Sequence, residues 1–471
     1  MPKASPFLAD PIAGLATPPG RGGVAVVRLS GAGCWFRLHP LLRFSAALPS
    51  PPLPPSPPPE RKLIRAEFLD ADGTPLDHLL VVHFPAPRSF TGEEQVELQG
   101  HGSMVVVRRI LQRLSEVGIR PAQPGEFSKR ACLNGKMNLL QAQAVLGLIE
   151  AGTLRGAKVA ARQLEGEAAA GLKVLREGLL QVLVHLEARI DFADEEIDPL
   201  EREGLVRSLR QLSGEVARLV RGMRLGQRLQ EGYYVVVVGR PNVGKSSLFN
   251  RLAGRERAIV SDQAGTTRDS LEVTLERNGL LITLVDTAGL RHSDCHIEAE
   301  GMRRTREHVR QADAVLLVAE AHRGVLPEDF AILAEVPAAL PRLWVWNKMD
   351  LLGDIPPSGL PEGLVSSFEV LPVSCHDGSG LAKLEARLEA LSNQGCDEVS
   401  APLMVAARHQ EHLERLSERL QEALREIEQE KYEEIAAWSL REGALVLGDM
   451  VGEIVTEEIL EGIFSRFCIG K

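Results

Sequence analysis

Residues 233–250 constrain the fold most strongly, because an apolar run leads into a glycine-rich loop and then into a helix-like stretch. Residues 233–238 read YYVVVV, the continuous apolar pattern of a buried parallel strand. The following GRPNVGKS, residues 239–246, matches the P-loop pattern G-x-x-x-x-G-K-S. Its glycines let the backbone wrap a phosphate, and its N–H groups and the helix N-terminus favour negative charge. The segment predicts a phosphate-binding loop on a parallel α/β sheet.

Individual roles follow from the chemistry of this loop. Lys245 is expected to reach the β- and γ-phosphates, and the Ser246 hydroxyl is expected to bind Mg²⁺. Arg240 also lies within the loop, but its side chain need not face phosphate.

Two further motifs narrow the nucleotide to GTP. The strand-like run 280–285 ends in DTAG, residues 286–289, a D-x-x-G pattern that can hold Mg²⁺ through water and sense the γ-phosphate. The apolar run 343–346 precedes NKMD, residues 347–350, which matches N-K-x-D. A carboxylate at Asp350 can accept both guanine N–H donors, whereas adenine would leave a buried acceptor unpaired.

Length and charge bound the organisation. A chain of 471 residues is too long for one core, so two to four domains are expected. The net charge of −10 argues against a broad phosphate footprint, so any RNA contact is local, weak or shared with a partner. The six cysteines are scattered singly, which predicts neither a zinc site nor disulfides and fits a reducing cytoplasm. Neither a signal peptide nor a membrane-spanning run is expected.

The sequence pattern predicts a multi-domain α+β fold. Residues 1–124 combine short strand-like runs with a helix at 103–117 and suggest a small α+β domain. Apolar residues at helical spacing predict a helical domain from 125–231 plus 394–471, with an antiparallel pair of long helices before residue 231. The βαβ pattern of 232–393 predicts an α/β P-loop domain inserted into the helical domain.

Two segments leave alternatives open. The proline-rich residues 49–59 predict an extended loop, which is either a tolerated insertion, the favoured interpretation, or a ligand for an SH3-type domain. The acidic turn at 191–198 is either a solvated turn beside a helix N-terminus, again favoured, or a cation site.

Residues 265–269, GTTRD, resemble the switch I segment of translation-factor-related GTPases, and this resemblance makes Thr267 a magnesium ligand. The fifth guanine loop is less usual, because Ser374-Cys375-His376 stands where this class has Ser-Ala-Lys. A base contact from the loop backbone can survive this change, but stacking by a lysine stem is lost. Leu290 follows the D-x-x-G motif, where Ras-like proteins have a water-orienting glutamine, so another group must orient water.

Nearly the full chain resembles the MnmE (TrmE) family of tRNA-modification GTPases. The resemblance is carried near the N-terminus by residues 17–24, 89–94, 97–102, 124–131 and 133–136, and at the end of the chain by Cys468-Ile469-Gly470-Lys471. It departs from the family at Ser103, Asn138 and Gln143, and in the proline-rich insertion.

The resemblance implies a K⁺ ion that neutralises charge near the phosphates. Its ligands would be Asn242, Thr266 and oxygens of the Ser261–Gln263 stretch, with Ser261 and Gln263 as named contributors. A switch II glutamate would orient water through a bridging water; alignment places it at Glu298, with Glu300 as the rival and a merely solvated glutamate as the other alternative. The GTP-binding residues are then Asn242, Val243, Gly244, Lys245, Ser246, Ser247, Ser261, Thr266, Thr267, Asp286, Thr287, Ala288, Gly289, Asn347, Lys348, Asp350, Ser374 and Cys375.

The family resemblance also implies a tetrahydrofolate site, for 5,10-methylene- or formyl-tetrahydrofolate, at an N-terminal homodimer interface. Arg28, Glu97 and Lys136 match the family's folate positions, and Lys471 is added from the C-terminus. A carboxylate can pair with the pterin N–H edge, and basic side chains can pair with folate carboxylates. Cys468 is a candidate nucleophile or thiol participant, with an inert, partly buried thiol as the alternative.

The implied function is modification of the tRNA wobble uridine at position 5 with an aminomethyl-type group, together with the flavoprotein MnmG in a heterotetramer. GTP hydrolysis would drive domain rearrangement. A ribosome-assembly GTPase is a second hypothesis, disfavoured by the acidic residues of 411–434. A signalling or structural GTPase whose N-terminal domain binds only protein is the third.

Overall fold

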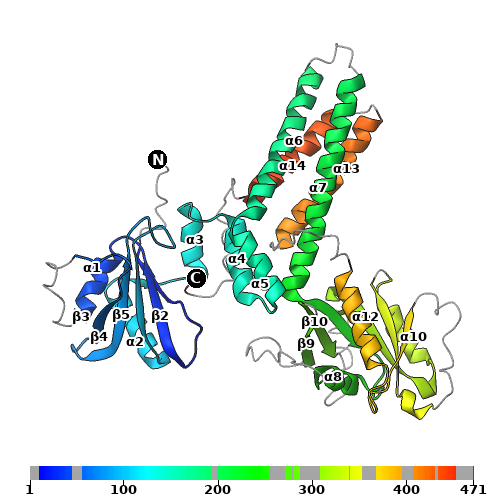
Figure 1. Cartoon of the computed structure of the whole chain (residues 1–471), viewed down its shortest axis with the longest axis horizontal. Coiled ribbons are helices and arrows are strands. Elements are labelled where there is room, and N and C mark those ends of the chain that lie inside the picture. The colour runs from blue at the N-terminus through cyan, green and yellow to red at the C-terminus, as the bar shows by residue number, and fades with distance from the viewer. Residues whose placement is uncertain are drawn as a thin grey trace. The chain divides into compact units, whose positions relative to one another are not determined.

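The computed structural model describes residues 10–44, 56–191, 199–254, 271–277, 279–286, 308–338, 340–352, 368–394, 407–429, 433–451 and residue 470. The chain divides into two compact units, whose elements are labelled in Figure 1. Unit 1 comprises Met1–Leu146, Leu164–Leu209 and Glu418–Lys471, and unit 2 comprises Gly147–Gln163 and Arg210–Ser417. Among the helices of the described ranges, none is both long and apolar enough to cross a bilayer.

Unit 1 contains a seven-stranded sheet in the order β3-β4-β5-β6-β2-β1-β7. Neighbouring strands are antiparallel except β1 and β7, which run parallel. The strands are β1 (Ile12–Leu15), β2 (Gly22–Ser30), β3 (Leu42–Phe44), β4 (Ile64–Leu69), β5 (Pro75–Phe84), β6 (Gln95–Gly102) and β7 (Arg120–Pro121).

One face of this sheet is apolar, because alternate side chains along its strands are buried, as at Val27 in β2. Helices α1 (Cys34–Leu38) and α2 (Met104–Glu116) contribute Trp35 and Leu114 to the same buried cluster. Each fully buried leucine of this kind stabilises the fold by roughly 2 kcal/mol. The helix predicted at 103–117 is confirmed as α2.

A buried ion-pair network joins α3 (Glu126–Leu133) to the loop before β6. The guanidinium of Arg130 is fully buried and donates to Glu93 Oε2 at 3.0 Å and to Glu126 Oε1 at 2.9 Å. Arg120 donates to the other oxygen of Glu126 at 2.8 Å. Burial opposes ionisation of Glu126, yet the two arginines and a backbone N–H lower its pKa to about 2.

The predicted long helices form as α6 (Glu167–Asp191) and α7 (Pro199–Glu231). In unit 1, α6 lies along α14 (Glu433–Val451), a helix from the far end of the chain (Figure 1). Arg176 Nε donates to Ala444 O across this contact at 3.2 Å. The remaining long helices are α4 (Leu139–Glu150), α5 (Leu154–Leu164) and α13 (Ala407–Glu428).

Unit 2 contains a six-stranded sheet in the order β13-β12-β11-β8-β10-β9. Its strands are parallel except β9, which pairs antiparallel with β10 at the sheet edge. The parallel α/β sheet predicted from the βαβ pattern is confirmed. The strands are β8 (Tyr233–Val238), β9 (Leu271–Arg277), β10 (Leu280–Asp286), β11 (Ala314–Glu320), β12 (Arg342–Asn347) and β13 (Glu369–Pro372).

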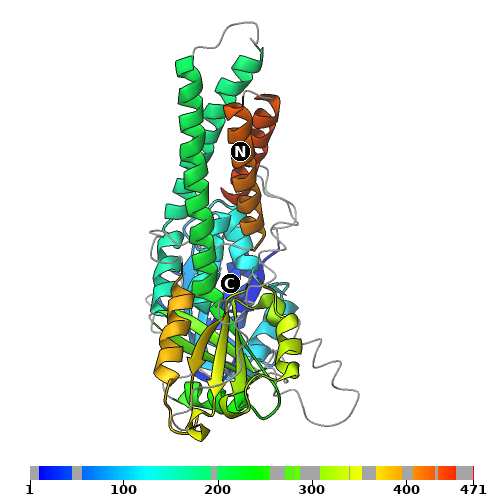
Figure 2. The same ribbon diagram turned by 90° about the vertical axis from the view of Figure 1, so that its right-hand side faces the viewer.

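Both faces of this sheet are buried, which explains the unbroken apolar run of β8. Odd-numbered residues of β8 pack in one cluster with α8 (Lys245–Gly254) and α12 (Leu381–Asn393). Even-numbered residues pack in a second cluster with α10 (Pro327–Ala334). Figure 2 shows α12 in gold and α10 in yellow-green on opposite sides of the sheet.

Two predicted segments fall largely outside the described residues. These are residues 49–55 of the proline-rich segment and residues 192–198 of the acidic turn.

Replacing Glu126 with glutamine tests the buried network. The variant leaves Arg130 buried with one carboxylate instead of two, so we expect the free energy of unfolding of unit 1 to fall by roughly 3 kcal/mol at pH 7. The folded-state pKa of about 2 lies below the ordinary 4.5, so the stabilisation is complete above pH 4.5 and is lost as the pH falls toward 2. Urea midpoints of variant and wild type should therefore converge over that interval.

Glu67→Gln is the matched control, because Glu67 pairs with Arg43 at an exposed position. It should change the free energy of unfolding by less than about 0.5 kcal/mol. Equal losses in both variants, or a Glu126 difference that does not depend on pH, would contradict the assignment.

Candidate nucleotide-binding site

The predicted nucleotide residues that the structure describes lie at one edge of the unit 2 sheet. Strands β8, β10, β11, β12 and β13 run parallel, so their carboxyl ends meet there. The P-loop follows β8, Asp286 ends β10, Asn347 ends β12, and Ser374 follows β13. This is the edge at which open α/β sheets bind ligands.

Two glycines shape the P-loop because neighbouring atoms approach its backbone closely. A Cβ on Gly239, whose φ is 151°, would lie 2.3 Å from Val318 O. A Cβ on Gly244, whose φ is 97°, would lie 2.2 Å from Asn347 Nδ2. A side chain at either position would force the loop away from these neighbours.

Lys245 begins α8 and is only 5% exposed. Its ammonium donates to the carbonyl oxygens of Gly239 and Arg240, both at 2.7 Å. These bonds fold the side chain back over the loop and hold its positive charge there. Ser246 and Ser247 are exposed on the first turn of the same helix.

The side chain of Arg240 forms a buried ion pair with Asp329. Its Nε donates to Asp329 Oδ1 at 2.8 Å, and the two side chains are 11% and 0% exposed. Asp329 also caps the start of α10, because its Oδ2 accepts from Leu326 N–H at 3.0 Å. This pair fixes the first half of the P-loop to α10.

Asn347 links the N-K-x-D segment to the P-loop and the guanine loop. It is 1% exposed, and its Nδ2 donates to Val243 O at 2.9 Å. Its Oδ1 accepts from Cys375 N–H at 3.3 Å. One buried amide therefore joins three sequence-distant segments.

Lys348 makes a second link to the P-loop. Its Nζ donates to Asn242 O at 3.0 Å and contacts Glu320 at the end of β11. Burial opposes ionisation of Glu320, but Lys348 lowers the pKa of that carboxyl overall.

Asp350, the predicted guanine reader, is oriented by Ser374. The buried Ser374 Oγ donates to Asp350 Oδ1 at 2.6 Å and accepts from His376 N–H and Asp377 N–H at 3.2 and 3.3 Å. Burial raises the pKa of the Cys375 thiol to about 11, so this thiol is neutral at pH 7. The carboxylate at Asp350 is exposed and held in a fixed orientation.

Several predicted residues lie outside the described part of the chain. They are Ser261, Gln263, Thr266, Thr267, Thr287, Ala288, Gly289, Glu298 and its rival Glu300, Cys468 and Lys471.

Sequence reasoning missed Asp329, Glu320 and Arg251, all of which contact the site. Asp329 had one usable signal, since a carboxylate shortly after a helix start predicts a cap. No sequence signal pairs it with Arg240, because 89 positions separate the two residues.

In unit 1, two predicted folate residues face each other. Arg28 and Glu97 are register partners on β2 and β6, with Arg28 Nε 3.0 Å from Glu97 Oε1. The Arg28 guanidinium lies over the rings of Phe90 and Phe127, at 5.4 and 5.9 Å from their centroids. Lys136 is exposed, and its Nζ donates to Pro87 O at 3.0 Å.

Gly470, near the C-terminus, packs beside this pair. A Cβ on Gly14 would lie 3.1 Å from Gly470 Cα and 3.2 Å from the Phe127 ring. Gly14 is the register partner of Arg28. Gly470 therefore adjoins the strand and the aromatic ring that border Arg28.

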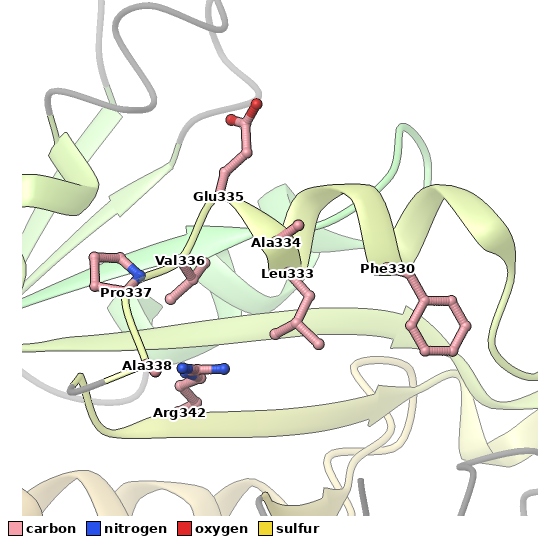
Figure 3. A pocket seen from close by; sticks show the side chains of 8 residues that line it. All are labelled: Phe330, Leu333, Ala334, Glu335, Val336, Pro337, Ala338 and Arg342. Atoms are coloured by element: carbon pink, nitrogen blue, oxygen red, sulfur yellow. The ribbon is translucent and has the colours of Figure 1, made fainter. Parts of the chain in front are cut away.

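A shallow depression of about 550 Å³ in unit 2 is a separate feature. Figure 3 shows Phe330 and Leu333 of α10 beside it, with Arg342 from the start of β12. Because β12 ends at Asn347, Arg342 marks the opposite edge of the sheet from the nucleotide residues. The depression is not the nucleotide site.

Comparison with known proteins covers almost the whole chain. The family described as GTP-binding protein TrmE N-terminus matches residues 11–136, and the MnmE helical domain family matches residues 139–468. A tRNA modification GTPase MnmE of Magnetococcus marinus is 43% identical over 469 residues, which cover 98% of each chain. The protein of the same name from Xylella fastidiosa strain Temecula1 is 40% identical and covers 100% of both chains.

Among solved structures, the G domain of the T. maritima FeoB iron transporter is 27% identical. The alignment covers 34% of this chain and 98% of that one, with a TM-score of 0.27.

Replacing Asp329 with asparagine tests the link between the P-loop and α10. The amide oxygen can still accept from Leu326 N–H, but the buried Arg240 loses its counter-charge. We expect the free energy of unfolding of unit 2 to fall by roughly 3 kcal/mol, measured by urea denaturation followed through tryptophan fluorescence, to which Trp344 and Trp346 of β12 contribute. Glu328→Gln, a charge loss at the adjacent exposed position, should change it by less than about 0.5 kcal/mol. Comparable effects of the two variants would show that the ion pair does not anchor the loop.

Proposed function

Since the chain belongs to the MnmE family of tRNA-modification GTPases, we propose that it is a K⁺-stimulated GTPase serving modification of the tRNA wobble uridine at position 5. Its fold is multi-domain α+β, and it is a GTP hydrolase of tRNA modification. The observation that carries the proposal is the buried amide of Asn347, which bonds to both the phosphate loop and the guanine loop.

We assign GTP binding to the residues at the carboxyl edge. Lys245, whose charge already lies over the P-loop, would hold the β- and γ-phosphates. Asp350, oriented by Ser374, would accept the two guanine N–H donors. Lys348 and Asn347 would keep the base-reading segment in register with the loop.

Cation binding fits the chemistry of the same residues. Hydroxyl and amide oxygens suit hard cations, and both the Ser246 side chain and Asn242 are exposed at the loop. Ser246 and Thr267 would hold Mg²⁺, and Asn242, Ser261, Gln263 and Thr266 would hold K⁺. These ions supply positive charge where negative charge develops on the phosphates. Glu298, with Glu300 as the rival, would orient the attacking water, because Leu290 has no polar side-chain atom.

A folate site in unit 1 is the second part of the proposal. Glu97 would pair with the pterin N–H edge, and Arg28 would be positioned by Phe90 and Phe127. The bound 5,10-methylene- or formyl-tetrahydrofolate supplies the one-carbon unit. Lys136 and Lys471 complete the proposed set. Cys468 is proposed as the thiol participant.

We retain the domain assignment of residues 1–124, 125–231 plus 394–471, and 232–393 as a proposal. The bond of α3 to the loop before β6, from Arg130 to Glu93, favours moving the first boundary beyond that helix. A homodimer and a heterotetramer with the flavoprotein MnmG, acting on tRNA, are the proposed assemblies.

GTP turnover in K⁺ against Na⁺ tests the hydrolysis scheme. We expect K⁺ at equal ionic strength to raise the turnover rate at least about ten-fold, because a fixed cation stabilises developing phosphate charge. Glu298→Ala should lose most of the K⁺-stimulated rate. Binding of a fluorescent GDP in both salts is the control and should not change. Equal rates in the two salts would reject the K⁺ assignment, and wild-type turnover by Glu298→Ala would remove that residue.

Mass spectrometry of tRNA nucleosides from a deletion strain tests the biological role. We expect the wobble uridine to lack its position 5 group in that strain. The wild-type gene should restore it, and Lys245→Ala should not, because phosphate binding depends on that ammonium. Cys468→Ser tests the thiol: loss of the modification would assign Cys468 a chemical role, and normal modification would show that its thiol is inert. Normal modification in the deletion strain would reject the function and favour a ribosome-assembly or signalling GTPase.

A further inference from the structure

Arg251 lies on α8, the helix that begins at the P-loop, and it reaches the guanine loop. Its Nε donates to Cys375 O at 2.8 Å, and its Nη2 donates to His376 O at 2.6 Å. The donors of a guanidinium are fixed in a planar fork, so one side chain can hold two successive carbonyls. Helix α8 therefore carries the phosphate-binding Lys245 at its start and, near its end, Arg251, which binds the guanine loop.

The guanine loop is held on its other side through its amides. Ser374 Oγ accepts from the N–H groups of His376 and Asp377, and Asn347 Oδ1 accepts from Cys375 N–H. The carbonyls of Cys375 and His376 are thus bound by α8, while their amides are directed to Ser374 and Asn347. The peptide planes 375–376 and 376–377 are therefore held on both sides, by Arg251 at their carbonyls and by Ser374 at their amides.

These contacts close a ring around the site. The P-loop carbonyl of Val243 is bonded to Asn347, Asn347 to Cys375, and Cys375 to Arg251. From Arg251 the α8 backbone returns to the P-loop at Lys245. Among the described residues, Arg251 is the one charged side chain that links the guanine loop to α8 in this ring.

We propose that Arg251 is a specificity-determining positioning residue for guanine. By holding the carbonyls of Cys375 and His376, it fixes the two peptide planes that follow Cys375, and so the position of the loop from which the Cys375 N–H can donate to guanine O6. The proposal rests on the proposed GTP site. Arg251 also compensates for the residue at position 376, because histidine lacks the long lysine stem that this loop usually places against the base.

The geometry of the Cys375 amide supports this role. Its bond to Asn347 Oδ1 is 3.3 Å long, at the weak end of the N–H···O range, so the same N–H can be shared with a base oxygen as a second acceptor. The same N–H would face the amino group of adenine, which is a donor, so a fixed amide also rejects the wrong base. A loosely held loop would lose both effects.

The test compares GDP with 6-thioguanosine 5′-diphosphate, which keeps the N1–H and 2-amino donors read by Asp350 but carries a weakly accepting sulfur in place of O6. The variant is Arg251→Met, which retains an apolar stem and removes every donor. We expect its Kd for GDP to rise about five-fold, as for loss of an exposed charge-assisted contact, and GDP release to accelerate correspondingly. Its Kd for the analogue should change less than about two-fold, because the sulfur of that ligand accepts only weakly from the Cys375 N–H.

Asn250→Ala is the control, since Asn250 is an exposed neighbour on the same helix. It should leave both affinities unchanged, and the thermal midpoints of both variants should match the wild type. Equal weakening of the two ligands by Arg251→Met would assign Arg251 a structural role only and overturn the proposal, as would unchanged GDP binding. Failure of the wild-type protein to bind GDP would instead reject the proposed GTP site itself.

Discussion

The buried amide of Asn347 is the interaction on which the nucleotide site depends. An amide both donates and accepts, so this side chain can serve the carbonyl of Val243 and the N–H of Cys375 together. Leaving either backbone group buried without a partner costs roughly 1–3 kcal/mol. The same close packing explains Gly244, since a Cβ there would meet the amide nitrogen. Gly244 of the P-loop and Asn347 of N-K-x-D therefore pack directly against each other, and the contact requires both residue types.

Buried ion pairs fix the surroundings of both candidate sites. Arg240 and Asp329 join the P-loop to α10, and Arg130 and Glu93 join α3 to the loop before β6. Such pairs contribute little net stability compared with apolar packing, but removing one partner leaves a charge stranded. Their geometry therefore admits few alternative arrangements. In unit 2, the charged pair holds the P-loop, whose backbone the proposed ligand must contact.

The sequence predicted the parallel sheet of unit 2 and its strand-ending motifs, because a strand buried on both faces needs an unbroken apolar run such as 233–238. The family resemblance assigned Arg28 and Glu97 to one site but did not predict that they pair with each other. Contacts between sequence-distant polar residues were not predictable: Arg240 and Asp329 carry no shared periodicity. The same holds for the packing of α6 along α14, since amphipathic stripes show that helices bury a face but not against which partner.

The ion pair between Arg240 and Asp329 limits how GTP can be hydrolysed. It is the one arginine in the sequence of residues 239–246, and an arginine supplied in cis is one known way to neutralise transition-state charge. For Arg240 to turn toward phosphate, Asp329 would be left buried and uncompensated, at a cost of about 3–5 kcal/mol. That cost corresponds to a population below roughly one in a hundred. With Leu290 unable to orient water and Arg240 held by Asp329, the loop itself offers only Lys245 as a cation. Further positive charge must then come from outside the P-loop side chains, and the Mg²⁺ and K⁺ sites proposed above at Ser246 and Asn242 would supply it.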